Sequence, residues 1–143
     1  MGTQRHRLAF AASLGACVSI AVGAVLGTAG FNALAWLVAG TGSSLGEVYA
    51  LVRPNSYYYA LFFLPSLVAG GLGGVVAAKL SDGIPYRSAL VAALLVMIWS
   101  VITFASPLSE VSLEASSLVP AFVFPVPSSI LGAYIYQRAM RDA

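Results

Sequence analysis

Residues 62–78 read FFLPSLVAGGLGGVVAA, with no charged side chain among them. Small residues recur at every fourth position along this stretch, at Ser66, Gly70, Gly74 and Ala78. In water such a helix would have no polar face, whereas in a bilayer small residues let two helix backbones approach closely. The stretch therefore predicts a membrane-spanning helix that packs tightly against another helix.

The rest of the chain shares this composition. Of the 143 residues, 59% are hydrophobic and 8% are charged, and the mean hydropathy is +0.90. Soluble domains carry about 25% charged residues, so this chain lacks the polar side chains to cover a surface facing water. The composition also excludes a disordered chain, which needs low hydrophobicity and high charge. We therefore expect an integral membrane protein in contact with the lipid bilayer.

The charged residues fall in five short zones that separate four uncharged stretches. Because a helix needs about 20 apolar residues to cross the bilayer, we expect an all-α single domain, a four-helix bundle. The predicted spans cover about residues 8–28, 57–78, 88–105 and 117–137. Residues 29–39 are also apolar, and they either extend the first span or form an outer interfacial segment anchored by Trp36.

The basic residues predict the orientation, since short cytoplasmic loops are enriched in Lys and Arg. With the N-terminus inside, six of the seven basic residues are cytoplasmic and only Arg53 is outside. The six are Arg5, Arg7, Lys79, Arg87, Arg138 and Arg141. We expect a multi-pass protein of the plasma membrane with both termini in the cytoplasm. The preference for Arg over Lys, with abundant Ala, Gly and Val, suggests a prokaryotic source.

The spacing of small residues predicts which helices pack together. Gly15, Ser19, Gly23 and Gly27 recur at every fourth position of the first span, like the line from Ser66 to Ala78 in the second span. Such spacing keeps residues on one helix face. We expect the two lines to face each other as an antiparallel pair, with a contact between subunits as the alternative.

A short pattern, Phe-x-x-Pro-Ser-x-(Val/Ile)-x-Gly, occurs at residues 62–70 and again at 124–132. The repeat suggests two related helical hairpins, formed by the first and second spans and by the third and fourth. Proline removes a backbone donor and crowds the preceding turn, so Pro65 marks a candidate kink in the second span. Pro125 and Pro127 predict that the fourth helix is kinked or locally broken near residues 124–129.

The serines beside these prolines, Ser66 and Ser128, are candidate polar residues within the membrane. They either line a polar path, as in transporters with interrupted helices, or bond to carbonyl oxygens that the prolines leave without a donor. The second interpretation fits the local repair that prolines in membrane helices commonly receive.

Reactive groups are scarce in the predicted spans, where no Asp, Glu, Lys, Arg or His lies in the hydrocarbon core. This argues against a proton-coupled transporter and against acid–base catalysis. Residues 42–46, GSSLG, match the G-x-S-x-G pattern of serine hydrolases, but the one histidine, His6, lies on the opposite side of the membrane. We expect no enzyme.

The sequence also limits the ligands and partners that we expect. One cysteine and one histidine do not build a metal site, and no motif for a cofactor is present. A net charge of +2 is too small for binding nucleic acid. We expect a non-enzymatic subunit or scaffold of a membrane assembly, as a homo-oligomer or with a membrane protein partner. The alternative is an oligomeric channel or facilitator for a small solute or ion.

Overall fold

The computed structural model describes residues 2–39, 44, 47, 57–81, 83–105 and 123–142. These residues contain four long helices, α1 (Gly2–Ala39), α3 (Tyr57–Leu80), α4 (Pro85–Ala105) and α6 (Pro125–Arg141), and no β-strand. Three of the helices, α1, α3 and α4, are long and apolar enough to cross a membrane. The expected all-helical class is therefore confirmed, with three candidate spans.

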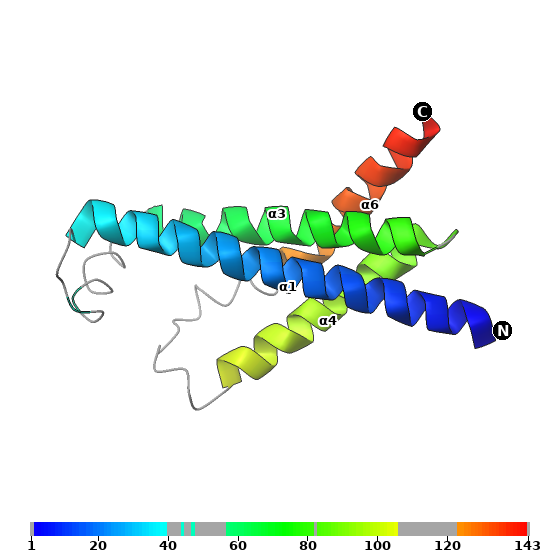
Figure 1. Cartoon of the computed structure of the whole chain (residues 1–143), viewed down its shortest axis with the longest axis horizontal. Coiled ribbons are helices and arrows are strands. Elements are labelled where there is room, and N and C mark those ends of the chain that lie inside the picture. Colours follow the sequence, from blue (N-terminus) through cyan, green and yellow to red (C-terminus); the bar gives the residue numbers. More distant parts are fainter. Residues whose placement is uncertain are drawn as a thin grey trace.

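Helix α3 packs against α1, α4 and α6. Figure 1 shows α1 and α3 side by side, with α4 and α6 crossing beside them at larger angles. The start of α1, the end of α3, the start of α4 and the end of α6 lie toward the same end of the molecule, at the right of Figure 1. Gly83, with a φ of +93° that favours glycine, lies in the short turn between α3 and α4.

Helix α1 is continuous from Gly2 to Ala39. Its 38 residues give a length of about 57 Å, well beyond the roughly 30 Å of a hydrocarbon core. Leu34 is only 8% exposed, while Trp36 is 66% exposed. Residues 29–39 thus extend the first helix, and this extension packs into the bundle as far as Leu34.

Helices α1 and α3 are antiparallel and their backbones are very close. A Cβ atom built on Gly15 would lie 2.6 Å from the carbonyl oxygen of Gly73, and one built on Gly23 would lie 3.5 Å from the Cβ of Ala69. Side chains larger than a hydrogen atom therefore do not fit between Gly15 and Gly73 without a backbone shift.

These contacts align α1 and α3 along their lengths and so define which part of α1 lies beside α3. Extending this alignment along both helices places Lys79 level with Ala11 and Tyr57 level with the turn that contains Leu34. The 24 residues of α3 span about 36 Å, close to the thickness of a hydrocarbon core. The part of α1 beside α3 therefore reaches further toward its C-terminus than the predicted span at 8–28.

The interior of the bundle consists of small residues. Among the residues whose burial is described, the buried hydrophobic ones are all alanines except Leu34, and the largest fully buried side chains are Ser81, Ser88 and Ser129. Large apolar side chains lie outside, with Val25 67% exposed. A water-soluble protein buries such side chains. The reverse distribution is expected where lipid covers the outside and close backbone contact holds the helices together.

The predicted partner of the glycine line on α3 is wrong. Gly70 and Gly74 are predicted to face α1, but a Cβ atom built on either would overlap Ser128 or Ser129 of α6. Ala78, the last residue of that line, packs with alanines of α4 and α6. The line therefore faces α6 and α4.

A neighbouring line on α3, Ala69, Gly73 and Ala77, faces α1 instead. It meets Gly15, Ser19 and Gly23 of the predicted α1 line, whereas Gly27 has nothing within 4 Å of a built Cβ. Helix α3 thus has two adjacent small-residue faces, of which the spacing predicted the first, and which neighbour each face meets depends on how the helices are placed around α3.

The prolines of α6 lie in its first turn, and α6 is helical from Pro125 to Arg141. The first N–H groups of a helix have no partner within it, so Pro125 and Pro127 remove donors that the helix does not use. The N–H of Ser128 then donates to the carbonyl oxygen of Phe124 at 3.1 Å. No kink lies within α6, which begins directly after a bend at Phe124, at the edge of the predicted region. Residues 117–122 of the predicted fourth span lie outside the described residues.

Gly74→Ala is expected to lower the free energy of unfolding by about 1–3 kcal/mol, because the added methyl overlaps the backbone of Ser129. Gly27→Ala is the matched control. Nothing lies within 4 Å of its Cβ, and alanine favours a helix over glycine by about 0.5–1 kcal/mol. The measurement is SDS titration of protein in detergent micelles, followed by circular dichroism. Equal losses in the two variants would contradict the contact between α3 and α6.

Candidate functional site

The candidate site is the set of polar contacts around α3, inside the bundle. Three buried serines, one from each neighbouring helix, donate a hydrogen bond to a backbone carbonyl oxygen of α3. The pairs are Ser19 of α1 with Ala69 at 3.0 Å, Ser88 of α4 with Ala77 at 3.0 Å, and Ser129 of α6 with Gly70 at 3.1 Å. Such interhelical bonds contribute about 0.6 kcal/mol each on average. Each neighbour of α3 is thus bonded to it directly.

Glycines make two of these carbonyl oxygens accessible. A helical side chain leans toward the N-terminus and covers the turn before it, so residue i+4 shields the carbonyl oxygen of residue i. Gly73 follows Ala69 by four positions, and Gly74 follows Gly70 by four. With no side chain at these two positions, the oxygens of Ala69 and Gly70 are open to serines from α1 and α6.

The repeated sequence pattern lies where α3 meets α6. The rings of Phe63 and Phe124 are in edge-to-face contact, with their centroids 4.9 Å apart and an interplanar angle of 76°. Further along the same interface a Cβ built on Gly132 would overlap the backbone of Gly71. The two stretches that carry the pattern therefore lie against each other. The contacts involve Phe63, a variable position of the first copy, and Gly71, which follows that copy by one residue.

Ser128 and Ser66, the predicted polar pair, have different surroundings. The Ser128 hydroxyl is buried and donates to the carbonyl oxygens of Phe124 at 2.6 Å and Pro125 at 3.2 Å. Its side chain also fills the space above Gly70. Ser66 is half-buried on α3, one residue after Pro65, which α3 accommodates within its length.

The buried polar side chains form hydrogen bonds within the bundle. Among the described residues, every buried side-chain nitrogen and oxygen has a hydrogen-bond partner. Ser100 and Thr103 also bond within their own helix, to the carbonyl oxygens of Val96 and Trp99. The buried serine hydroxyls of the described interior thus use their donor hydrogens within the protein.

Ser44, the central serine of the GSSLG stretch, has a structural role. Its N–H donates to Oε2 of Glu47 at 2.8 Å, and the Glu47 N–H donates to the Ser44 hydroxyl at 3.4 Å. This is the capping box that starts a helix. The Ser44 N–H, and then its hydroxyl, lower the pKa of the exposed Glu47 carboxyl. The carboxylate, and with it the cap, thus persists at mildly acidic pH and is lost as the pH falls through that lowered value.

No group of three or more His, Cys, Asp or Glu residues that could hold a metal ion occurs among the described residues. Cys17 is a free, exposed thiol in the middle of α1. Comparison with protein-family models, with curated proteins and with solved structures gives no match to this chain.

Sequence reasoning missed two of the three interhelical donors, Ser88 and Ser129. The repeated pattern pointed to Ser128, whose hydroxyl bonds to Phe124 directly before its own helix. The neighbouring Ser129 bonds to α3 instead, and only the helix geometry distinguishes the two serines. Ser88 belongs to a run of small residues with Ala89, Ala92 and Ala93, whose spacing was the available signal.

Ser129→Ala is expected to lower the free energy of unfolding by about 0.6–1.7 kcal/mol, because the bond to Gly70 is lost. Ser100→Ala is the control, since its hydroxyl bonds to Val96 of the same helix and joins no two helices. We expect a change of only a few tenths of a kcal/mol there. SDS titration of both variants in micelles measures the difference, and a larger loss in Ser100→Ala would contradict the role of Ser129.

Proposed function

We propose that this chain is a non-enzymatic subunit or scaffold of a membrane assembly. The observation that carries the proposal is an exposed line of small side chains on α1, together with an interior whose described polar groups are already hydrogen-bonded. The first feature is suited to binding another helix, and the second leaves little chemistry for a substrate.

This line lies on the side of α1 turned away from α3. Its residues recur at intervals of three and four over about 22 Å, and we call it the outer α1 face. They are Ser13, Cys17, Ala21, Ala24 and Thr28, all exposed. Because lipid tails pack against large side chains as readily as small ones, a small-residue face favours a second backbone over lipid. The partner is a second copy of the chain or another membrane protein.

Other exposed positions lack this property. On α4 the corresponding outward residues are large, with Leu94 45% and Ile98 55% exposed. Bulky, branched side chains keep a neighbouring backbone at a distance and suit contact with acyl chains. We therefore place the partner helix on α1 and lipid on α4.

The charges support the orientation that we propose, with both termini in the cytoplasm of a prokaryotic cell. Six cations belong to the helix ends that lie together in Figure 1. They are Arg5, Arg7, Lys79, Arg87, Arg138 and Arg141. An excess of basic residues on one side is typical of the cytoplasmic side. In this arrangement α6 belongs to the fourth crossing.

A channel or facilitator is the alternative, and it relies on Ser66 and Ser128. The hydroxyl of Ser128 is bonded to two carbonyl oxygens of its own chain, and its side chain lies against Gly70. These contacts favour a packing role over conduction, so we prefer the scaffold.

The orientation is tested by cysteine labelling in a Cys17→Ser background, with single cysteines replacing Gln4, Ser44 or Asp142. A membrane-impermeant maleimide should label the Ser44→Cys variant in intact cells. It should label Gln4→Cys and Asp142→Cys only after the membrane is permeabilised, since the basic end is retained inside. Labelling of Asp142→Cys in intact cells would overturn the proposed orientation.

The subunit role is tested by photo-crosslinking in native membranes. A benzophenone amino acid at Ala21, on the outer α1 face, should give discrete protein adducts, whereas the same group at Leu94 should react with lipid. Adducts of twice the mass of the chain indicate a second copy, and other masses indicate another protein. Ala24→Leu, which blocks the face, should abolish the adduct and leave the unfolding free energy unchanged. No adduct at Ala21, or equal adducts at both sites, would contradict the proposal.

A further inference from the structure

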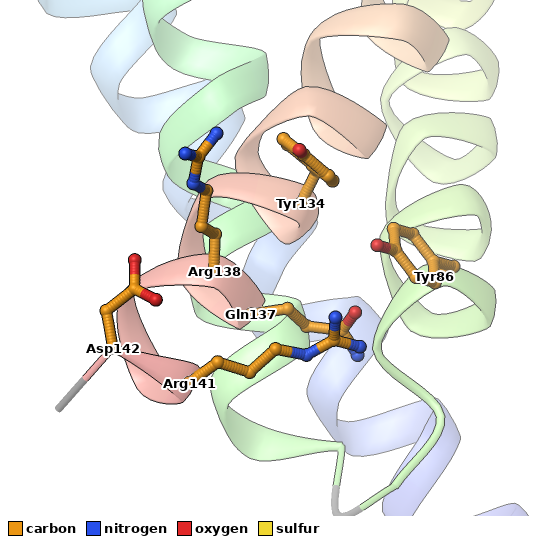
Figure 2. Close-up of a pocket in the computed structure, with 6 residues that line it drawn as sticks. All are labelled: Tyr86, Tyr134, Gln137, Arg138, Arg141 and Asp142. Atoms are coloured by element: carbon orange, nitrogen blue, oxygen red, sulfur yellow. The ribbon is translucent and has the colours of Figure 1, made fainter.

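A cavity of about 260 Å³ lies between the start of α4 and the end of α6, at the basic end of the bundle. Its lining residues are Tyr86 of α4 and Tyr134, Gln137, Arg138, Arg141 and Asp142 at the C-terminal end of the chain. In Figure 2 the guanidinium of Arg141 and the amide of Gln137 lie side by side and face Tyr86. The guanidinium of Arg138 extends in another direction, beside Tyr134, and the carboxylate of Asp142 also points away from Tyr86.

The lining is rich in hydrogen-bond donors and carries a positive charge. Arg138 and Arg141 are exposed, and among the described residues neither is in an ion pair. Asp142 supplies the one carboxylate of the lining. A guanidinium presents a planar fork of N–H donors that matches the oxygens of a phosphate group. The cavity is therefore suited to a phosphate-bearing ligand.

The walls of the cavity continue into the membrane as apolar lines. On α4, Leu90 and Leu94 follow Tyr86 at intervals of four and are 40% and 45% exposed. On α6, Leu131 lies one turn before Tyr134 and is 56% exposed. Helix α4 begins at the cavity and α6 ends there. Both lines of apolar residues therefore run from the polar opening along the apolar part of the bundle. A ligand that fits both parts has a charged head and hydrocarbon tails.

We propose that this cavity binds the headgroup of an anionic phospholipid of the cytoplasmic leaflet. Arg141, with Gln137 beside it, binds the phosphate, and Arg138 adds positive charge to the same lining. Tyr86 and Tyr134 lie at the headgroup level, where tyrosines are enriched. The acyl chains lie along Leu90, Leu94 and Leu131. Basic pockets between membrane helices on the cytoplasmic side bind such headgroups. The inference requires the basic end to face the cytoplasmic leaflet, and it does not depend on the subunit role.

The test uses the full chain, delipidated in a neutral detergent, with lipid binding followed by native mass spectrometry. Phosphatidylglycerol is titrated against phosphatidylcholine, which carries a phosphate and no net charge. The double variant Arg138→Gln, Arg141→Gln removes both cavity cations. The matched control, Arg5→Gln with Lys79→Gln, removes two exposed cations from the same end of the bundle, outside the cavity. Circular dichroism verifies that both doubles keep the helix content of the parent.

We expect phosphatidylglycerol to bind more tightly than phosphatidylcholine. The double variant Arg138→Gln, Arg141→Gln should lose about fivefold in affinity for phosphatidylglycerol for each arginine removed, roughly 20- to 30-fold in total. The control variant, Arg5→Gln with Lys79→Gln, should lose less than about fivefold. Millimolar glycerol 3-phosphate should not displace the lipid, because it lacks the acyl chains.

Three results would overturn the inference. Equal losses in the two doubles would mean that the affinity reflects total charge, and equal binding of the two lipids would mean that the headgroup charge is not recognised. Displacement by glycerol 3-phosphate would assign the cavity to a soluble phosphate compound. Because no partner protein is present, the outcome is independent of the crosslinking at Ala21.

Discussion

Among the described residues, α3 comes into close backbone contact with its neighbours at Gly73 and Gly74. Gly73 lies against Gly15 and Ser19 of α1, and Gly74 lies against the backbone of Ser129 of α6. In a bilayer no hydrophobic force drives one apolar helix toward another, so close packing and hydrogen bonds must supply the attraction. Without these two glycines, neither α1 nor α6 could reach the carbonyl oxygens of α3.

Close packing and hydrogen bonding are therefore two consequences of the same residues. Removing a side chain brings the neighbouring helix nearer and also uncovers an acceptor one turn earlier on α3. Ser19 and Ser129 then bond to Ala69 and Gly70. These bonds use the hydrogen of each hydroxyl within the protein, so the described interior is a packed and hydrogen-bonded core.

The surface divides into parts of different chemistry. The outer α1 face, Ser13 to Thr28, is small and favours another helix, while the outer side of α4 is bulky and favours lipid. The cavity at the basic end, lined by Arg138 and Arg141, adds a charged site between the start of α4 and the end of α6. A lipid held there would contact α4 and α6 together, on the side of the bundle that the outer α1 face does not occupy.

The sequence determined that the chain is a helical membrane protein, because composition and uncharged length select lipid as the solvent for most side chains. It also located small residues on α1 and α3, since a spacing of four marks a face whatever the neighbour is. The tertiary structure decided that Gly70 and Gly74 meet α6 instead of α1, that Ser129 and not Ser128 bonds to α3, and that Tyr86 joins Arg138 in one cavity. Periodicity along one helix contains no information about the position of the next, which depends on backbone distances between segments far apart in the chain.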